Sequence, residues 1–347
     1  MTRILVISKQ LVRWNGASKV AYELSKQFQK NHEVRLLVYH DCIDSVWEDE
    51  LDIYKLKHKG VLAFREIRQQ IAEYKPDIIH SHDWLGLLAL DSSIPQIATV
   101  HSNWPMNWFF SPTNFVAGFI QEIPNDIKLH LVDKVISVSK YQQRKLASRG
   151  IESKVIYNGV NEEFFRGAEN KIKLNHPAIL FVGSIDNRKA KYLIPIIKKI
   201  NSKREKIYFY ILGNPTDNKI VKQIKLLDNA IYLGRVDNII PYYYESDALL
   251  FISRQEACPL VILEAKACGL PVFAFDICSN RELIRDGIDG FILNKGDIKG
   301  MVEAIINLVN GSITIDRQLI KQEVETLLWG SIAREYLASI RDIASDK

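Results

Sequence analysis

The sequence has few cysteines and no long apolar run, and both absences narrow the possible classes of protein. Only four cysteines occur among 347 residues, and no CxxC pair is present, which argues against a disulfide framework, a zinc ribbon and a thioredoxin-type motif. No stretch approaches the roughly 18 apolar residues of a membrane span. The first apolar run, residues 4–7, is too short for a signal-peptide core. We therefore expect a cytoplasmic protein, with peripheral contact at the inner membrane surface left open.

A strong excess of either charge is also missing. Lys and Arg number 46 and Asp and Glu number 41, for a net charge of +5. This balance does not indicate a nucleic-acid partner. The hydrophobic fraction of 47% is that of an ordinary globular protein, and the length predicts about two domains.

Short apolar runs alternate with longer amphipathic segments, and the alternation occurs twice. The first series predicts strands at residues 4–7, 33–39, 78–80, 96–100 and 134–138, with helices at 19–30 and 61–74. The second series predicts strands at 178–182, 207–212, 230–233, 248–252 and 272–275, with a helix at 259–267. Continuous β-branched runs separated by helices indicate parallel sheets that are covered on both faces.

The predicted fold class is therefore α/β, with two tandem Rossmann-like, doubly wound domains that face each other across a cleft. We expect the first domain at residues 1–167, the second at 168–330, and a C-terminal helix within 331–347 that could pack back on the first. Ligands of such sheets bind outside the carboxyl ends of the strands. Candidate site residues should therefore follow the predicted strands.

The most informative segment follows the strand predicted at 248–252 and contains two glutamates, Glu256 and Glu264. Carboxylates accept hydrogen bonds from vicinal hydroxyls, so two of them beside an anion site suit a ligand with a sugar on either side of a diphosphate. The alternative interpretation is that Glu256 is a charge at a helix start and Glu264 lies on a solvated face.

A short helix is predicted between these glutamates and the next strand. Pro259 suits its first position and Gly269 suits the residue just beyond its end. Such a helix leaves the amides of Leu260 and Val261 without intrahelical partners, which favours a bound phosphate.

A second candidate segment follows the strand at 178–182. It begins with Gly183 and Ser184 and continues to Arg188 and Lys189, which we expect to open a helix. Cations at a helix N-terminus oppose its dipole by about 0.3–1 kcal/mol each. An anionic ligand would offset that cost, whereas the lysines further along are expected to form a solvated face.

Gly16 lies in the loop between the first predicted strand and helix. A glycine there allows a backbone to approach a ligand closely, or it serves only as a turn residue. The surrounding residues do not form a GxGxxG motif, which disfavours a dinucleotide-dependent dehydrogenase.

Histidines follow two predicted strands of the first domain. His80 and His82 alternate onto one strand face with Asp83 next, and His101 and Asn103 follow the strand at 96–100. No clear third ligand completes a metal site, so these residues either line a ligand site or are structural.

An aromatic-rich segment begins at Trp104 and could bind an acceptor, contact a membrane or form ordinary core.

Taken together, these segments resemble family four of the retaining glycosyltransferases, which have the GT-B architecture. The segment from Glu256 to Glu264 is similar to that family's E-x7-E signature. Four other stretches of the chain are similar to further motifs of that family, and they follow one another in the family's order. From the N-terminus these stretches are 15–24, 135–139, 155–161 and 285–292. Lys189 holds the lysine position of the family's phosphate site, whereas Ser184 stands where the family has arginine.

The resemblance implies a metal-independent, retaining enzyme without a cofactor. Glu256, Lys189 and His101 are then the expected catalytic residues. The expected donor-binding residues are Gly16, Ser184, Arg188, Lys189, Pro259, Leu260, Val261 and Glu264, and the expected acceptor-binding residues are His82, Asp83, Asn103 and Trp104.

The implied substrates are a nucleotide-diphospho sugar, with UDP favoured over GDP, and a saccharide, lipid-linked or small-molecule hydroxyl acceptor. Synthesis of a cell-surface polysaccharide or glycoconjugate is the expected setting. The alternative is a catalytically silent protein that binds a sugar nucleotide and supports another transferase, for which Ser184 is the main argument. An epimerase or phosphorylase has no supporting motif.

Overall fold

The computed structural model describes residues 1–12, 14–39, 47, 50–58, 61–82, 93–101 and 127–345. The chain forms two compact units: Met1–Gly159 with Trp329–Lys347 make unit 1, and Val160–Leu328 make unit 2. The sequence predicted the end of the first domain at residue 167. Residues 160–167 instead belong to unit 2, where the hydroxyl of Tyr244 donates to the carbonyl of Phe164 at 2.8 Å.

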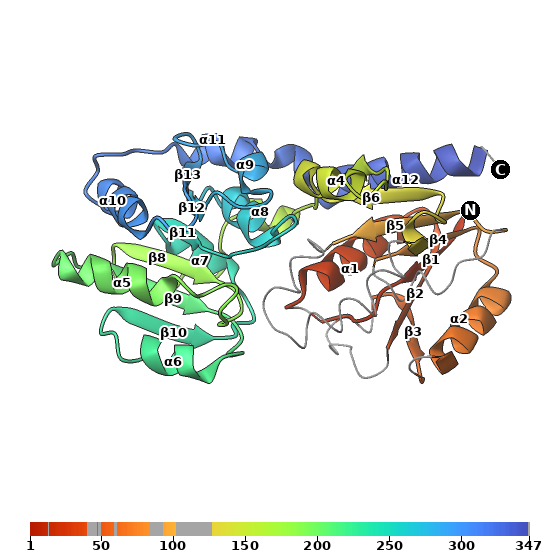
Figure 1. Cartoon of the computed structure of the whole chain (residues 1–347), viewed down its shortest axis with the longest axis horizontal. Helices are drawn as coiled ribbons and strands as arrows, with labels where there is room; N and C mark the ends of the chain where they lie inside the picture. Colours follow the sequence, from red (N-terminus) through yellow and green to blue (C-terminus); the bar gives the residue numbers. More distant parts are fainter. Residues whose placement is uncertain are drawn as a thin grey trace. The chain divides into compact units, whose positions relative to one another are not determined.

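Unit 1 is built on a parallel sheet whose described strands run in the order β3-β2-β1-β4-β5-β6-β7 (Figure 1). The strands are β1 (Arg3–Ile7), β2 (Glu33–Tyr39), β3 (Asp52–Leu56), β4 (Ile78–Ser81), β5 (Gln96–Val100), β6 (Lys134–Ser137) and β7 (Lys154–Val155). The helices are α1 (Gly16–Gln29), α2 (Val61–Tyr74), α4 (Lys140–Ala147) and α12 (Trp329–Ser345). Leu5 and Leu37 of the sheet are buried with Ile67 of α2, and α12 packs against α1.

Unit 2 has a second parallel sheet, with its strands in the order β10-β9-β8-β11-β12-β13. The strands are β8 (Ala178–Val182), β9 (Tyr208–Leu212), β10 (Ala230–Gly234), β11 (Ala248–Phe251), β12 (Val272–Phe275) and β13 (Gly290–Leu293). The α-helices are α5 (Leu193–Ser202), α6 (Asn218–Ile224), α7 (Ile240–Glu245), α8 (Leu260–Ala267), α9 (Asn280–Leu283), α10 (Ile298–Val309) and α11 (Arg317–Gln322), and the 3₁₀ helices are η4 (Glu162–Phe165) and η5 (Glu325–Leu327).

The core of unit 2 explains why its strands are continuous apolar runs. Phe181 and Phe273 of the sheet are buried with Ile197 of α5 and Ile305 of α10 on one face. Leu249 is buried outside this cluster, and α8 contacts both β11 and β12. No helix in the described ranges is both long enough and apolar enough to cross a membrane.

The predicted fold class, two doubly wound α/β units, is confirmed, because both sheets are parallel and their strand orders reverse direction beside the first strand. The strands predicted at 33–39, 96–100, 178–182 and 272–275 have these bounds in the structure. Strand β3 was not predicted. It is an edge strand with the sequence DIYKL and is largely half-buried, so it lacks the apolar run that marks the central strands.

Two helix starts differ from the prediction by a few residues. Helix α1 begins at Gly16 instead of residue 19, because the side chain of Asn15 caps it by accepting from the Ser18 N–H at 3.0 Å. Gly16 is therefore the exposed first residue of a helix and does not lie in a loop.

Helix α8 begins at Leu260, so Pro259 is its N-cap and not its first helical residue. Gly269 follows the helix end with a φ of +72°, as predicted.

A buried ion pair fixes α8 within unit 2. Lys266 Nζ lies 2.8 Å from Asp289 Oδ2, and their side chains are 4% and 0% exposed. The same ammonium donates to the carbonyl of Leu283 at 2.7 Å, and Asp289 also accepts from the Arg285 N–H at 2.8 Å. Both charges are therefore compensated by hydrogen bonds as well as by each other.

Replacing Lys266 by Met should destabilise unit 2 by about 3–5 kcal/mol, because the buried Asp289 carboxylate loses its nearer cation and is left with Arg285, whose Nε lies 3.8 Å away. Urea unfolding followed by circular dichroism and tyrosine absorbance measures this change, since all six tryptophans lie in unit 1. The matched control is Arg281→Met, which breaks a pair with Asp276 whose arginine is 58% exposed and should cost only about 0–1 kcal/mol. Equal losses in both variants would contradict the structural role of the buried pair.

Candidate functional site

The carboxyl ends of β8 and β11 are neighbours, because these two strands pair in parallel. A backbone hydrogen bond joins the loops that follow them: the Arg254 N–H donates to the Arg188 carbonyl at 2.9 Å. Residues that are far apart in the sequence therefore meet at the edge where doubly wound sheets bind ligands.

The loop after β8 does not start a helix at Arg188 and Lys189, and that prediction is wrong. Asp186 Oδ1 accepts from the backbone N–H groups of both residues at 2.8 Å, which makes a side-chain-capped turn. Helix α5 begins only at Leu193. A Cβ atom at Gly183 would lie 3.2 Å from Lys189 Cδ, so the glycine leaves space for the lysine side chain.

Lys189 and Glu256 form an ion pair across the two loops. Lys189 Nζ lies 3.0 Å from Glu256 Oε1, and the side chains are 22% and 16% exposed. The hydroxyl of Ser253 donates to the same oxygen at 3.1 Å. The structure therefore brings two predicted catalytic residues together and holds both in one orientation. Arg188 is exposed beside them, and Ser184 is half-buried at the start of the loop.

Glu264 is buried on α8 and does not lie on a solvated face. Its Oε2 accepts a hydrogen bond of 3.0 Å from the hydroxyl of Tyr243, which is 0% exposed. Burial, and then the negative charge of Glu264, raise the pKa of Tyr243 well above its usual value. The phenol therefore stays protonated and remains a donor to the carboxylate.

The N-terminus of α8 lies on the same segment as Glu256. Pro259 caps the helix without a side-chain hydrogen bond, and its carbonyl accepts from the Ile262 N–H at 3.2 Å. Within the described ranges, the N–H groups of Leu260 and Val261 have no acceptor. They are the orphan donors that a helix N-terminus offers to an anion.

In unit 1 the structure brings His82 and His101 together at the carboxyl ends of β4 and β5. His82 Nδ1 lies 2.9 Å from His101 Nε2. Within the same two strands, His80 Nε2 of β4 lies 2.8 Å from the hydroxyl of Thr99 of β5. The remaining predicted residues of this group, Asp83, Asn103 and Trp104 with the aromatic segment, lie outside the described residues.

The histidines of this cluster are neutral at pH 7. Burial lowers the pKa of His101 to about 4. Burial first, and the charge of His101 second, lower the pKa of His80 to about 3. Burial and both neighbouring imidazoles lower the pKa of His82 well below its usual range. The described part of the chain contains no group of three His, Cys, Asp or Glu side chains placed to hold a metal ion.

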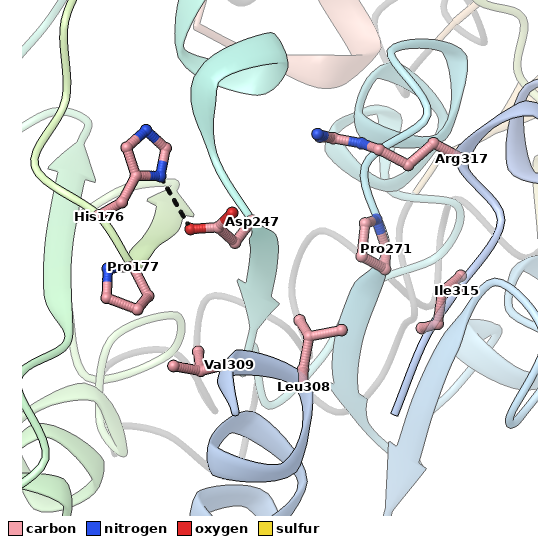
Figure 2. Close-up of a pocket in the computed structure, with 8 residues that line it drawn as sticks. All are labelled: His176, Pro177, Asp247, Pro271, Leu308, Val309, Ile315 and Arg317. Carbon is pink, nitrogen blue, oxygen red and sulfur yellow. Dashed lines mark hydrogen bonds and ion pairs between the residues drawn. The ribbon is translucent and has the colours of Figure 1, made fainter. Parts of the chain in front are cut away.

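A separate pocket of about 380 Å³ lies at the opposite edge of the second sheet (Figure 2). Pro177, Asp247 and Pro271, which line it, immediately precede β8, β11 and β12. His176 Nδ1 donates to Asp247 across one side at 3.1 Å. Since this pocket is at the amino ends of the strands, it is not the predicted donor site.

Sequence comparison identifies the protein class. Residues 14–164 match the family described as Glycosyltransferase Family 4, and residues 176–311 match the family described as Glycosyl transferases group 1. This chain is a GT-B glycosyltransferase. The predicted resemblance to family-four glycosyltransferases is thereby confirmed, whereas the retaining mechanism and the E-x7-E signature stay predictions.

Relatives and solved structures agree with this assignment. The glycosyltransferase is 34% identical over 184 residues to an uncharacterized 41.2 kDa protein from the cps region of Klebsiella pneumoniae, and the match spans about half of each chain. It is 28% identical over 313 residues, 81% of each chain, to an uncharacterized glycosyltransferase of Methanocaldococcus jannaschii.

Two solved structures share the fold. Sucrose-phosphate synthase from Thermosynechococcus elongatus has a TM-score of 0.83 at 16% identity and matches over 100% of both chains. The Anabaena protein HepE in complex with UDP-glucose has a TM-score of 0.80 at 15% identity, over 99% of this chain and 100% of HepE.

Sequence reasoning missed the residues that hold the glutamates and the lysine in place. Tyr243, Ser253 and Asp186 act through contacts that form only in the fold. Ser253 lies three residues before Glu256, but nothing in that spacing distinguishes it from any other loop serine.

Replacing Tyr243 by Phe should lower the free energy of unfolding of the glycosyltransferase by about 1.5–3 kcal/mol, because the buried Glu264 loses a hydrogen bond to a charged acceptor. Thermal and urea unfolding measure this loss. The matched control is Tyr242→Phe, a half-buried residue of the same helix, which should change stability by less than about 0.5 kcal/mol. If the Tyr243 variant were as stable as wild type, the contact with Glu264 would not be the one that fixes its carboxylate.

Proposed function

We propose that this glycosyltransferase moves a sugar from a nucleotide-diphospho sugar, preferably a UDP-sugar, to a hydroxyl of a saccharide or glycoconjugate acceptor. The observation that carries this proposal is the ion pair between Lys189 and Glu256 beside the N-terminus of α8. It puts a cation, a carboxylate and helix amides at the ligand-binding edge of one sheet. The complex of HepE with UDP-glucose supports UDP as the carrier. Similarity to the capsular polysaccharide biosynthesis glycosyltransferase CapM of Staphylococcus aureus, 27% identical over 193 residues, supports a polysaccharide product.

The diphosphate is the part of the donor that this arrangement suits best. Lys189 and the amides of Leu260 and Val261 are donors that can stabilise the negative charge developing on the departing nucleotide. Because Lys189 is already paired with Glu256, the diphosphate shares the ammonium with that carboxylate. Glu256 thereby orients the lysine, and its carboxylate is proposed to contact a hydroxyl of the transferred sugar.

Glu264 is proposed to accept hydrogen bonds from the ribose hydroxyls. Tyr243 occupies one of its oxygens, so the carboxylate presents a fixed geometry to the ribose. In unit 1, His101 is proposed to contact the transferred sugar or the acceptor, and His82 to support that site.

The reaction is proposed to retain the configuration of the anomeric carbon. The bond from that carbon to the diphosphate oxygen breaks, the acceptor oxygen bonds to the same face, and the acceptor proton passes to the departing diphosphate. Charge on the leaving group is then met by Lys189 and the helix amides, and no bound metal is required by this scheme.

A panel of UDP-, GDP- and ADP-sugars tests the function directly. Thermal shift measures binding, and nucleotide release in the presence of oligosaccharide acceptors measures transfer. Binding with turnover of a UDP-sugar is the expected result. Binding without nucleotide release from any donor would favour the alternative of a silent sugar-nucleotide-binding partner, which the replacement of the family arginine by Ser184 suggests. Absence of both would refute the proposal.

Replacing Lys189 by Met should lower turnover about 10²–10³-fold, because one preorganised charge donor to the leaving group is lost. Initial rates of nucleotide release measure the effect. The matched control is Lys191→Met, an exposed lysine two residues away that lies 5.6 Å from the ring of Tyr192, for which the rate should stay within about twofold. Wild-type turnover in the Lys189 variant would show that this lysine does not face the diphosphate.

A further inference from the structure

The buried histidines of unit 1 contain a hydrogen bond whose direction matters. His82 and His101 share one contact, between Nδ1 of the first ring and Nε2 of the second, at 2.9 Å. The two rings are nearly parallel, with an interplanar angle of 10°. Since both imidazoles are neutral, one of the two nitrogens carries the proton and the other accepts it.

The other nitrogen of His82 decides between the two directions. Its Nε2 is buried and has no hydrogen-bond partner in the part of the chain that the structure describes. A buried N–H without an acceptor is rarer in proteins than a buried acceptor without a donor. The proton of His82 is therefore favoured on Nδ1, from which it is donated to His101 Nε2.

This direction fixes the tautomer of His101. With its Nε2 acting as an acceptor, the neutral ring must carry its own proton on Nδ1. The Nδ1–H of the partly buried His101 is then the donor that this ring can offer to a ligand.

The ring of His80 packs against the ring of His82. The two ring centroids are 4.2 Å apart, and His80 is anchored through Nε2 to Thr99, whose hydroxyl donates to the hydroxyl of Tyr336 at 3.3 Å. The His80 contact is directed at Thr99 and does not reach His101. The hydrogen bond of His80 is therefore separate from the one between His82 and His101.

We propose that His82 is a positioning residue that holds His101 as the neutral Nδ1–H tautomer, so that His101 presents an N–H donor to a sugar hydroxyl oxygen. The sugar as the ligand of His101 rests on the proposed function, whereas the tautomer itself does not. A neutral donor binds a hydroxyl without placing a positive charge beside the anomeric carbon, where positive charge develops during transfer.

Nitrogen NMR of the full chain tests the tautomer without any substrate. The protein is labelled with ¹⁵N-histidine, and two-bond ¹H–¹⁵N spectra are recorded at pH 7, with assignment by single substitutions. His101 should show a protonated Nδ1 and an unprotonated Nε2. A protonated Nε2 in the wild-type protein would overturn the proposal, whatever the variants do.

Three substitutions separate positioning from packing. His82→Phe keeps an aromatic ring but removes the hydrogen bond, and His101 should then show a mixture of tautomers. His82→Asn keeps an N–H donor near the position of Nδ1 and should restore the single tautomer. The matched control is His80→Phe, which perturbs the same buried cluster and should leave the tautomer of His101 unchanged. A tautomer that changes equally in the His80 and His82 phenylalanine variants would overturn the proposal.

Kinetics complete the test with the donor found in the nucleotide-sugar panel. The His82→Phe variant should lose roughly tenfold in kcat, the value of about one hydrogen bond, while KM for the donor stays within about twofold. His82→Asn should recover most of kcat. An unchanged kcat in His82→Phe would overturn the role in transfer. If no donor is turned over by the wild type, the proposed function fails, and the NMR result still decides the tautomer.

Discussion

Parallel pairing of β8 with β11 is the constraint on which the candidate donor site depends. It brings the loops after the two strands together, so that Lys189 and Glu256 lie 3.0 Å apart. The side chains of this pair keep 22% and 16% of their exposure, so a ligand can reach them. The Lys266–Asp289 pair, which joins α8 to the residue before β13, is 4% and 0% exposed, so its charges are unavailable to a ligand. Burial thus separates an ion pair that can serve function from one that maintains the fold.

Burial changes the pKa of ionisable side chains in both units, with a different result in each. In unit 2 the buried Glu264 keeps a donor, Tyr243, whose phenol cannot ionise near neutral pH because its pKa is raised well above the usual value. In unit 1 burial lowers the pKa of His101 to about 4, so the cluster gives up its charge.

The sequence predicted the fold well because its central strands are uninterrupted apolar runs, as in β2 and β8, whose bounds agree with the prediction. It failed where the outcome depended on a contact. The edge strand β3 is half-exposed and carries a mixed pattern. Asp186 binds the amides of Arg188 and Lys189, yet the chain continues in turns and α5 begins only at Leu193. Of the site, spacing identified Glu256 and Glu264, while Tyr243 became recognisable only through its contact in the fold.

Under the proposed function, Ser184 leaves Lys189 as the main side-chain cation for the diphosphate. The family arginine is absent, and Arg188, which follows in the same loop, has an exposed side chain and a backbone already used by Asp186 and Arg254. An exposed cation is screened by solvent and contributes little to a specific contact. The amides at the start of α8 carry the partial positive charge of the helix and need no side chain. Under the proposed function, the diphosphate is therefore held by one oriented ammonium and one helix terminus, and the orientation of that ammonium by Glu256 becomes as important as its charge.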